Sequence, residues 1–148
     1  MTLTIAAMDR ENYKDAAFIG RENLREAWSE EVCLTQVDNP NDHTLIAYAD
    51  GEPAGFLSVW EVAGEMEINN IAVMEGFRRK GIALELFREM FRRLPHAERA
   101  VLEVRASNMA AMGLYSQLGF SKAGLRKRFY TDPEEDAVIM VKEMRREV

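Results

Sequence analysis

Three consecutive cations, Arg78-Arg79-Lys80, are followed by Gly81 and then by a long helical pattern. The apolar run Ile71-Ala72-Val73 stands before them, so the order is typical of a strand, a turn and a helix. The start of a helix has unpaired backbone N–H groups and a partial positive charge, which together favour a bound anion. The turn therefore predicts an anion-binding site. The alternative is a solvated basic turn that opens an ordinary surface helix.

A second group of polar residues lies further along the chain. Glu103 stands between two apolar residues of a strand-like run, so its side chain points away from theirs. A carboxylate that faces a cleft can act as a general base, whereas an ion pair with Arg105 on the same face is the structural alternative. Asn108 is placed to cap a helix, and Tyr115 falls two turns later within the apolar stripe of that helix. Residue type alone favours structural roles for all three.

Composition limits the classes of protein that the chain can represent. Its 148 residues, 47% of them hydrophobic, suit one globular domain, which we expect to span residues 1–148. A single cysteine, Cys33, excludes an internal disulfide, and His43 and His96 are far apart in the sequence. We therefore expect no metal site and a reducing, cytoplasmic location.

The net charge of −6 argues against general nucleic-acid binding, which needs a basic surface. It is compatible with a cationic protein or an amine as partner, although solubility alone would explain it. The N-terminus has no signal-peptide pattern, and no apolar run approaches the roughly 20 residues that span a bilayer. We expect no membrane partner. The basic run Arg126-Lys127-Arg128 is interpreted as a solvated face, with a second anion contact as the alternative.

The hydrophobic pattern predicts one mixed sheet covered by helices, with a ligand outside the carboxyl ends of the strands that lead into the last two helices. Asp50-Gly51 predicts a tight hairpin, and Gly119 suits a left-handed residue after a helix. Strands are expected at Thr2–Ala7, Thr44–Ala49, Pro53–Trp60, Glu65–Val73, Ala100–Arg105, Phe120–Leu125 and Ala137–Glu143. Helices are expected at Arg10–Arg25, from Ser29 to before Asn39, along the stripe from Ala83 to Leu94, and from Asn108 to about Leu118.

Several segments, in the right order, resemble one family over nearly the whole chain. The run Arg78-Arg79-Lys80-Gly81-Ile82-Ala83 fits the Q/R-x-x-G-x-G/A signature of the GCN5-related N-acetyltransferase (GNAT) superfamily, with Ala83 where many members have glycine. The block Leu102–Asn108, followed by Leu114-Tyr115 and Leu118-Gly119-Phe120, resembles the ribosomal-protein-alanine N-acetyltransferase (RimI-like) subfamily. The same subfamily is resembled by Ala27–Glu30, Asn70–Val73, Arg128–Tyr130 and Glu135–Met140.

The resemblance implies an α/β (α+β) GNAT fold: a mixed, mostly antiparallel central sheet, splayed between two parallel strands and flanked by helices on both faces. It also implies acetyl-CoA as co-substrate. The pantetheine arm would meet the backbone of Ile71, Ala72 and Val73, and Asn108 would hold the cofactor from the second helix. The residues implied around the pyrophosphate are Arg78, Arg79, Lys80, Gly81, Ile82, Ala83 and Leu84.

By the same resemblance, Glu103 is the general base and Tyr115 the general acid, and Asn70 and Tyr130 contact the acceptor. The implied reaction is acetylation of a protein N-terminal amine, that of an N-terminal alanine of a small-subunit ribosomal protein, by direct attack in a ternary complex. Roughly a tenth of an N-terminal amine is neutral at pH 7, and a much smaller share of a lysine amine is. A single carboxylate as general base is therefore more adequate for an N-terminal amine than for a lysine amine. The alternatives are a lysine or small-molecule amine acetyltransferase and a non-catalytic acyl-CoA-binding module.

Overall fold

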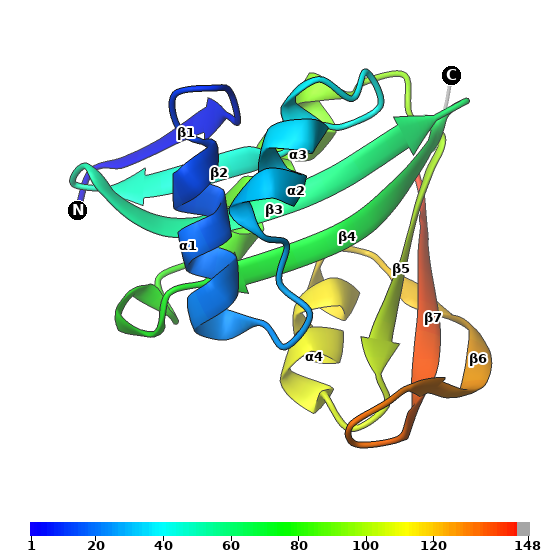
Figure 1. The fold of residues 1–148 in the computed structure, drawn as a ribbon. Helices are drawn as coiled ribbons and strands as arrows, with labels where there is room; N and C mark the ends of the chain where they lie inside the picture. The colour runs from blue at the N-terminus through cyan, green and yellow to red at the C-terminus, as the bar shows by residue number, and fades with distance from the viewer. Residues whose placement is uncertain (145–148) are drawn as a thin grey trace. The chain divides into compact units, whose positions relative to one another are not determined.

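The computed structural model describes residues 1–144 and arranges seven strands in one sheet, in the order β1-β2-β3-β4-β5-β7-β6 (Figure 1). The elements are β1 (Leu3–Ala7), α1 (Tyr13–Asn23), α2 (Glu30–Val37), β2 (Leu45–Ala49), β3 (Glu52–Val62), β4 (Glu65–Val73), the short 3-10 helix η1 (Glu75–Phe77), α3 (Ile82–Arg93), β5 (Arg99–Arg105), α4 (Met109–Gln117), β6 (Ser121–Tyr130) and β7 (Glu135–Glu143).

The chain divides into two compact units. Unit 1 comprises Met1–Glu61 and Asn69–Pro95, and unit 2 comprises Val62–Ile68 and the chain from His96 onward. Strand β4 contributes its first residues to unit 2 and its last residues to unit 1. The prediction of a single domain stays a prediction.

Unit 1 has helices on both faces of its strands. Helices α1 and α2 pack together, and their residues Ile19 and Cys33 join Ile46 of β2 and Phe56 of β3 in one buried cluster. Successive residues of a strand point to opposite faces, so Leu57 points to the other face, where α3 packs against β2. Because both faces are covered, β2 is apolar along its length instead of alternating.

Short-range signals in the sequence are confirmed by the backbone. Asp50 and Gly51 both have positive φ angles, 50° and 86°, as a tight hairpin turn between β2 and β3 requires. The Ser29 hydroxyl accepts a hydrogen bond from the Val32 N–H at 3.2 Å and so caps α2. Gly119 has a φ of 98° directly after α4, in the left-handed region that glycine adopts readily.

Helix α1 is shorter than the helix expected at Arg10–Arg25. The carboxylate of Asp9 accepts two backbone N–H groups from the residues that follow it, and the side chain of Asn12 accepts the N–H of Asp9 at 2.7 Å. These short-range bonds hold the chain in a turn and compete with helical hydrogen bonds. The helix therefore begins at Tyr13.

Unit 2 is organised around β5. This strand pairs in parallel with Glu65–Glu67 of β4 and antiparallel with β7. Alternate residues from Ala100 to Val104 are buried, and those between them are more exposed. Strand β5 thus has one core face and one face that carries Glu103 and Arg105.

Strand β6 is longer than the strand expected at Phe120–Leu125. It continues to Tyr130, and its pairing with β7 shifts register between Arg126 and Tyr130. Within the shift, Arg128 has a φ of 53° and its N–H donates to the Asp136 carboxylate at 2.9 Å. The irregularity is a β-bulge, which bends an edge strand and interrupts the alternating pattern that sequence analysis depends on.

The predicted fold class is confirmed. The structure is a mixed, mostly antiparallel sheet with helices, and within residues 1–144 the β4–β5 pair is parallel. The splay expected between those two strands stays a prediction. None of the helices in residues 1–144 is long and apolar enough to cross a membrane.

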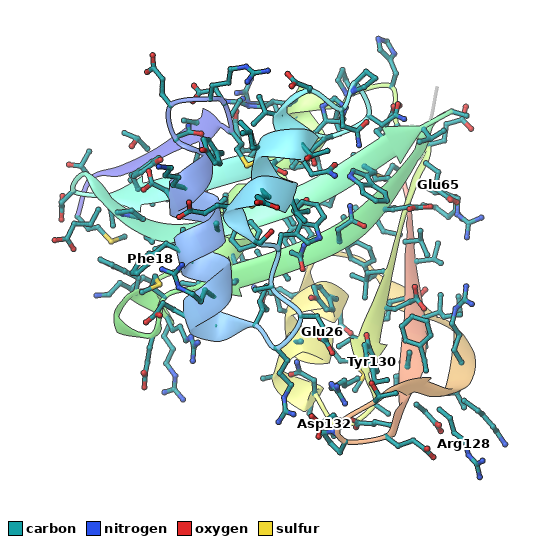
Figure 2. The ribbon with its side chains drawn as sticks, viewed as in Figure 1. Phe18, Glu26, Glu65, Arg128, Tyr130 and Asp132 are labelled. Atoms are coloured by element: carbon teal, nitrogen blue, oxygen red, sulfur yellow. The ribbon has the colours of Figure 1, made fainter. Side chains whose placement is uncertain are left out.

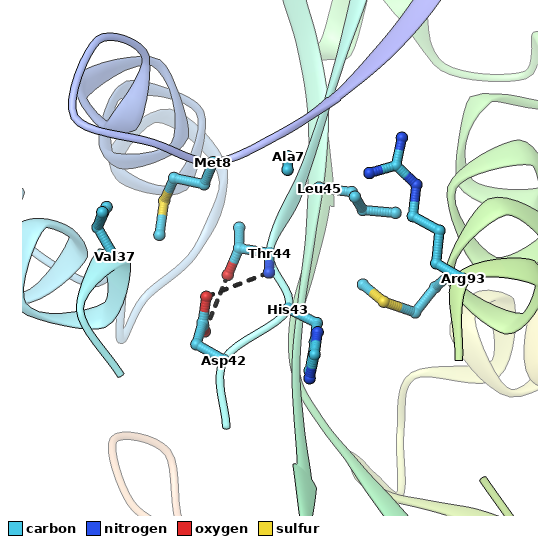
Figure 3. Close-up of a pocket in the computed structure, with 9 residues that line it drawn as sticks. Ala7, Met8, Val37, Asp42, His43, Thr44, Leu45 and Arg93 are labelled. Atoms are coloured by element: carbon cyan, nitrogen blue, oxygen red, sulfur yellow. Dashed lines mark hydrogen bonds between the residues drawn. The ribbon is translucent and has the colours of Figure 1, made fainter. Parts of the chain in front are cut away.

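Unit 1 contains a cavity of about 130 Å³ near the start of β2 (Figure 3). Its lining includes Asp42, His43, Thr44 and Arg93 and none of the residues predicted for the functional site. The Asp42 carboxylate accepts hydrogen bonds from the Thr44 N–H at 3.1 Å and from its hydroxyl at 3.0 Å. Burial nevertheless raises the pKa of Asp42, because desolvation outweighs these two bonds.

The raised pKa of Asp42 predicts that the unfolding free energy of the protein depends on pH. The protonated carboxyl contributes stability that is fully present below the unfolded pKa of about 3.9, and this stability is lost as the pH rises through the folded value. Wild-type protein should therefore lose unfolding free energy relative to Asp42→Asn as the pH increases. Urea unfolding of both proteins at steps between about pH 4 and pH 7 measures this difference.

A difference that does not vary with pH would contradict this prediction. The matched control for the loss of one negative charge is Asp38→Asn, because the Asp38 side chain is 63% exposed and forms only a surface ion pair with Arg10.

Candidate functional site

The basic turn before α3 has an unusual backbone. Gly81 stands at the N-cap position with a φ of 79°, and Arg79 has a φ of 65°. A non-glycine residue in this region costs roughly 1–2 kcal/mol, and such strain is concentrated at ligand-binding sites. The N-cap residue Gly81 has no side chain that could cap α3, so the N–H groups of the first turn donate no hydrogen bond to a side chain of that residue. Arg79, Lys80 and Gly81 are all exposed.

Arg78 is held differently from the two cations that follow it. Its Nε donates to the carbonyl oxygen of Val73 at 3.0 Å, and its Nη2 donates to the side-chain oxygen of Asn23 at 2.7 Å. Asn23 is the last residue of α1, and its amide nitrogen donates to the carbonyl of Ile19. Arg78 therefore ties the turn to the end of β4 and to α1. A contact between Arg78 and a cofactor stays a prediction.

The end of β4 contains the predicted backbone contacts Ile71, Ala72 and Val73 and the predicted acceptor contact Asn70. A Cβ on Gly55 of the neighbouring strand β3 would lie 2.9 Å from the Ala72 carbonyl oxygen, so glycine permits the close approach of the two backbones. Sequence analysis missed Asn69. Its side-chain nitrogen is buried and lacks a hydrogen-bond partner within residues 1–144, which costs about 1–3 kcal/mol unless a bound polar group pairs with it.

In unit 2, the Glu103 side chain is 33% exposed and projects from β5. Its Oε2 lies 2.9 Å from Nε of Arg126 on β6, and the Arg126 side chain is 58% exposed. The ion pair considered from the sequence was with Arg105, which instead pairs with Glu135 at 3.3 Å. Strand pairing brings Arg126 close to Glu103 across the sheet, and a solvent-exposed pair of this kind is weak and easily exchanged for another partner.

Asn108 is the N-cap residue of α4 and Tyr115 lies within this helix, as predicted. The side-chain oxygen of Asn108 accepts the Ala111 N–H at 3.1 Å, which confirms its role as helix cap. Tyr115 is 6% exposed, and its ring meets that of Phe120 edge-on at 5.9 Å. Burial, with a smaller contribution from Tyr130, raises the pKa of Tyr115 to about 12. The hydroxyl of Tyr115 therefore keeps its proton at neutral pH.

Tyr130, predicted to contact the acceptor, ends β6 next to the connection to β7 (Figure 2). The guanidinium of Arg105 lies 4.5 Å from the centre of its ring, within the range of a cation–π interaction. Arg128, three-quarters of the way along β6, points outward and has an 81% exposed side chain (Figure 2). The two arginines of the basic run are thus exposed, as expected of a solvated face, and Arg126 also pairs with Glu103.

Other reactive side chains are not assembled into a site. Cys33 is 1% exposed, and burial raises the pKa of its thiol to about 11, so the reactive thiolate is scarce at neutral pH. Among residues 1–144, no group of three or more His, Cys, Asp or Glu side chains could hold a metal ion. Anion binding at the turn of unit 1, and acid–base roles for Glu103 and Tyr115 of unit 2, stay predictions.

Comparison with known proteins identifies the family of the chain. The model of the acetyltransferase (GNAT) family matches residues 8–120. A Bacillus subtilis protein, provisionally named a ribosomal protein bS18-alanine N-acetyltransferase, is 40% identical over 106 residues, which are 70% of each chain. The enzyme of that name from Escherichia coli K12 is 40% identical over 95 residues, 62% of this chain and 64% of its own.

A solved structure extends the similarity to the whole chain. The crystal structure of the ribosomal-protein-S18-alanine N-acetyltransferase from Escherichia coli superposes with a TM-score of 0.90 and 29% identity, covering 99% of this chain and 97% of that one. The chain belongs to the GNAT acetyltransferase family, and the predictions of that family and of an N-acetyltransferase are confirmed.

Proposed function

We propose that this acetyltransferase transfers the acetyl group of acetyl-CoA to the N-terminal α-amine of a protein, with the N-terminal alanine of ribosomal protein bS18 as acceptor. The observation that carries the proposal is the likeness over 99% of the chain to an enzyme named for that reaction. The 40% identity to two relatives with the same name supports it. A ribosomal acceptor would be met in the cytoplasm, which is the location that we propose.

We assign the pyrophosphate of acetyl-CoA to the turn before α3 in unit 1. The N–H groups at Gly81, Ile82, Ala83 and Leu84 suit a pyrophosphate, because they stand at a helix N-terminus whose N-cap residue is a glycine without a capping side chain. The charges of Arg79 and Lys80 strengthen the attraction for an anion. Arg78 supports the turn through Val73. The end of β4 and Asn108 are assigned to the pantetheine arm.

The reaction requires the transfer of one acetyl group and of two protons. The acceptor amine, about a tenth of which is neutral at pH 7, attacks the thioester carbonyl and forms the new C–N bond. Glu103 removes the proton from that nitrogen. The Glu103 side chain is partly exposed, so its carboxylate is accessible for this role. The C–S bond then breaks, and the thiolate of CoA takes up a proton. Because Cys33 is buried and protonated, direct attack is supported over an acyl-enzyme on this thiol.

The raised pKa of Tyr115 refines its proposed role. An ordinary thiol has a pKa of about 8.5, so complete proton transfer from a phenol with a pKa of about 12 to the thiolate is uphill by roughly 5 kcal/mol. A hydrogen bond from the hydroxyl to the developing thiolate stabilises the leaving group without that cost. Tyr115 is therefore proposed as a donor to sulfur, with solvent supplying the final proton.

Acceptor choice is tested with two synthetic peptides and mass spectrometry. One begins with a free alanine and has no lysine, and the other has a blocked N-terminus and one internal lysine. We expect acetylation of the first peptide and of the N-terminus of purified bS18, because an α-amine is more readily deprotonated than a lysine amine. Transfer to the lysine peptide alone would overturn the α-amine assignment.

Glu103→Gln should lower kcat by about 10²–10⁴-fold, since a carboxamide cannot accept the proton of the amine. Binding of acetyl-CoA, measured by calorimetry, should be unchanged. Glu52→Gln is the matched control, because Glu52 is exposed at the start of β3 in unit 1. Full turnover by the Glu103 variant would remove this residue from the mechanism.

Tyr115→Phe should lower kcat by about tenfold to a hundredfold through loss of the donor to sulfur. Because the pKa of Tyr115 is about 12, its ionisation should not shape the activity profile below about pH 11. Steady-state rates against pH measure both effects, and Tyr13→Phe in α1 is the control for loss of a hydroxyl. An unchanged kcat at neutral pH would exclude the hydroxyl from the reaction.

A further inference from the structure

Arg105, the last residue of β5, holds the connection between β6 and β7, which we define as residues 131–134. Its Nη1 donates to the carbonyl oxygen of Pro133 at 3.0 Å, and its Nη2 donates to that of Thr131 at 3.1 Å. The same guanidinium lies 4.5 Å from the centre of the Tyr130 ring. One side chain thus holds two carbonyl groups of the connection and the aromatic residue before it.

Glu135 completes this arrangement. Its Oε1 lies 3.3 Å from Nη1 of Arg105, and its Oε2 accepts the Ser107 N–H at 2.6 Å. The side chains of Arg105 and Glu135 are each only 18% exposed. Since Ser107 precedes the cap residue of α4, the network joins three segments: the end of β5, the start of α4 and the connection 131–134. A partly buried network with several partners is more rigid than an isolated surface pair.

The network lies on the same strand as Glu103, the proposed general base. Glu103 and Arg105 are two residues apart on one strand, so their side chains leave the same face, about 7 Å apart along the strand. The proposed general base and the residue that holds the connection 131–134 therefore project from the same face of β5. Tyr130, already assigned to the acceptor, is one of its direct partners.

We propose that Arg105 is a positioning residue for the acceptor peptide: it fixes Tyr130 and the connection 131–134 in the arrangement that receives the peptide, and it takes no part in acetyl transfer. This inference rests on the proposed function. It requires arginine, because the two carbonyl groups and the ring are engaged by a planar fork that the single ammonium of lysine does not reproduce.

The test compares Arg105→Lys with wild-type enzyme in steady-state kinetics. We expect KM for the alanine-first peptide to rise about tenfold or more, the loss that removal of one charged hydrogen bond produces. At saturating peptide, kcat and KM for acetyl-CoA should stay within about twofold of wild type. Arg99→Lys is the matched control, because Arg99 lies at the other end of β5 in an exposed ion pair with Glu65.

A double-mutant cycle shows whether Arg105 acts through Tyr130. Tyr130→Leu should also raise KM for the peptide, and the double variant should show less than the product of the two single effects. Independent, multiplicative effects would overturn the proposal, as would a fall in kcat with KM for the peptide unchanged. If Arg105→Lys does not fold, as judged by circular dichroism, Tyr130→Leu alone must still raise KM for the peptide without affecting KM for acetyl-CoA.

Amide hydrogen exchange separates this inference from the proposed function. In unliganded enzyme, the amides of Thr131, Asp132 and Glu134 should exchange faster in Arg105→Lys than in wild type and at the wild-type rate in Arg99→Lys. If wild-type enzyme acetylates lysine instead of an N-terminus, the proposed acceptor is wrong, and the KM comparison is made with the lysine peptide. Unchanged exchange in Arg105→Lys would overturn the positioning role whichever amine is acetylated.

Discussion

The N-terminus of α3, which begins at a glycine without a capping side chain, is the constraint on which the proposed anion site of unit 1 depends. A helix that begins without a capping side chain leaves N–H groups to be satisfied by water or by a ligand. The turn before it contains two residues in the left-handed region, one of them Arg79, which has a Cβ and adopts this conformation at a cost. The two hydrogen bonds of Arg78 hold the turn in place. The contacts that hold this turn in the fold therefore also hold the site that we propose for the pyrophosphate.

A second constraint, the alternation of β5, organises unit 2. Leu102 and Val104 are buried, so the residues between and after them must face the other side of the strand. Both of these residues are charged, and both find opposite charges on the neighbouring part of the sheet: Glu103 with Arg126 and Arg105 with Glu135. The two pairs differ in burial. The exposed pair leaves Glu103 accessible, whereas the less exposed pair fixes the connection 131–134.

Much of the fold could be predicted from short-range signals. The hairpin at Asp50-Gly51, the cap at Ser29 and the left-handed Gly119 each depend on residues that are neighbours in the sequence. The errors have equally specific causes. Helix α1 starts late because Asp9 and Asn12 form a competing turn, and β6 runs on because a bulge at Arg128 breaks the two-residue period. A pattern with a fixed period does not represent either feature.

The sequence alone determined the family, the order of the elements and the candidate residues, because each of these is written in local spacing and residue type. Only the tertiary structure decided which charges meet. From the sequence, Arg105 was the candidate ion-pair partner of Glu103. In the folded chain, Glu103 instead forms an ion pair with Arg126, and Arg105 donates hydrogen bonds to the connection 131–134. The pKa of Tyr115 could likewise not be predicted from the sequence, since it is set mainly by the burial of this side chain in the folded protein. Pairing and burial arise when separate segments pack together, so they become visible only in the folded chain.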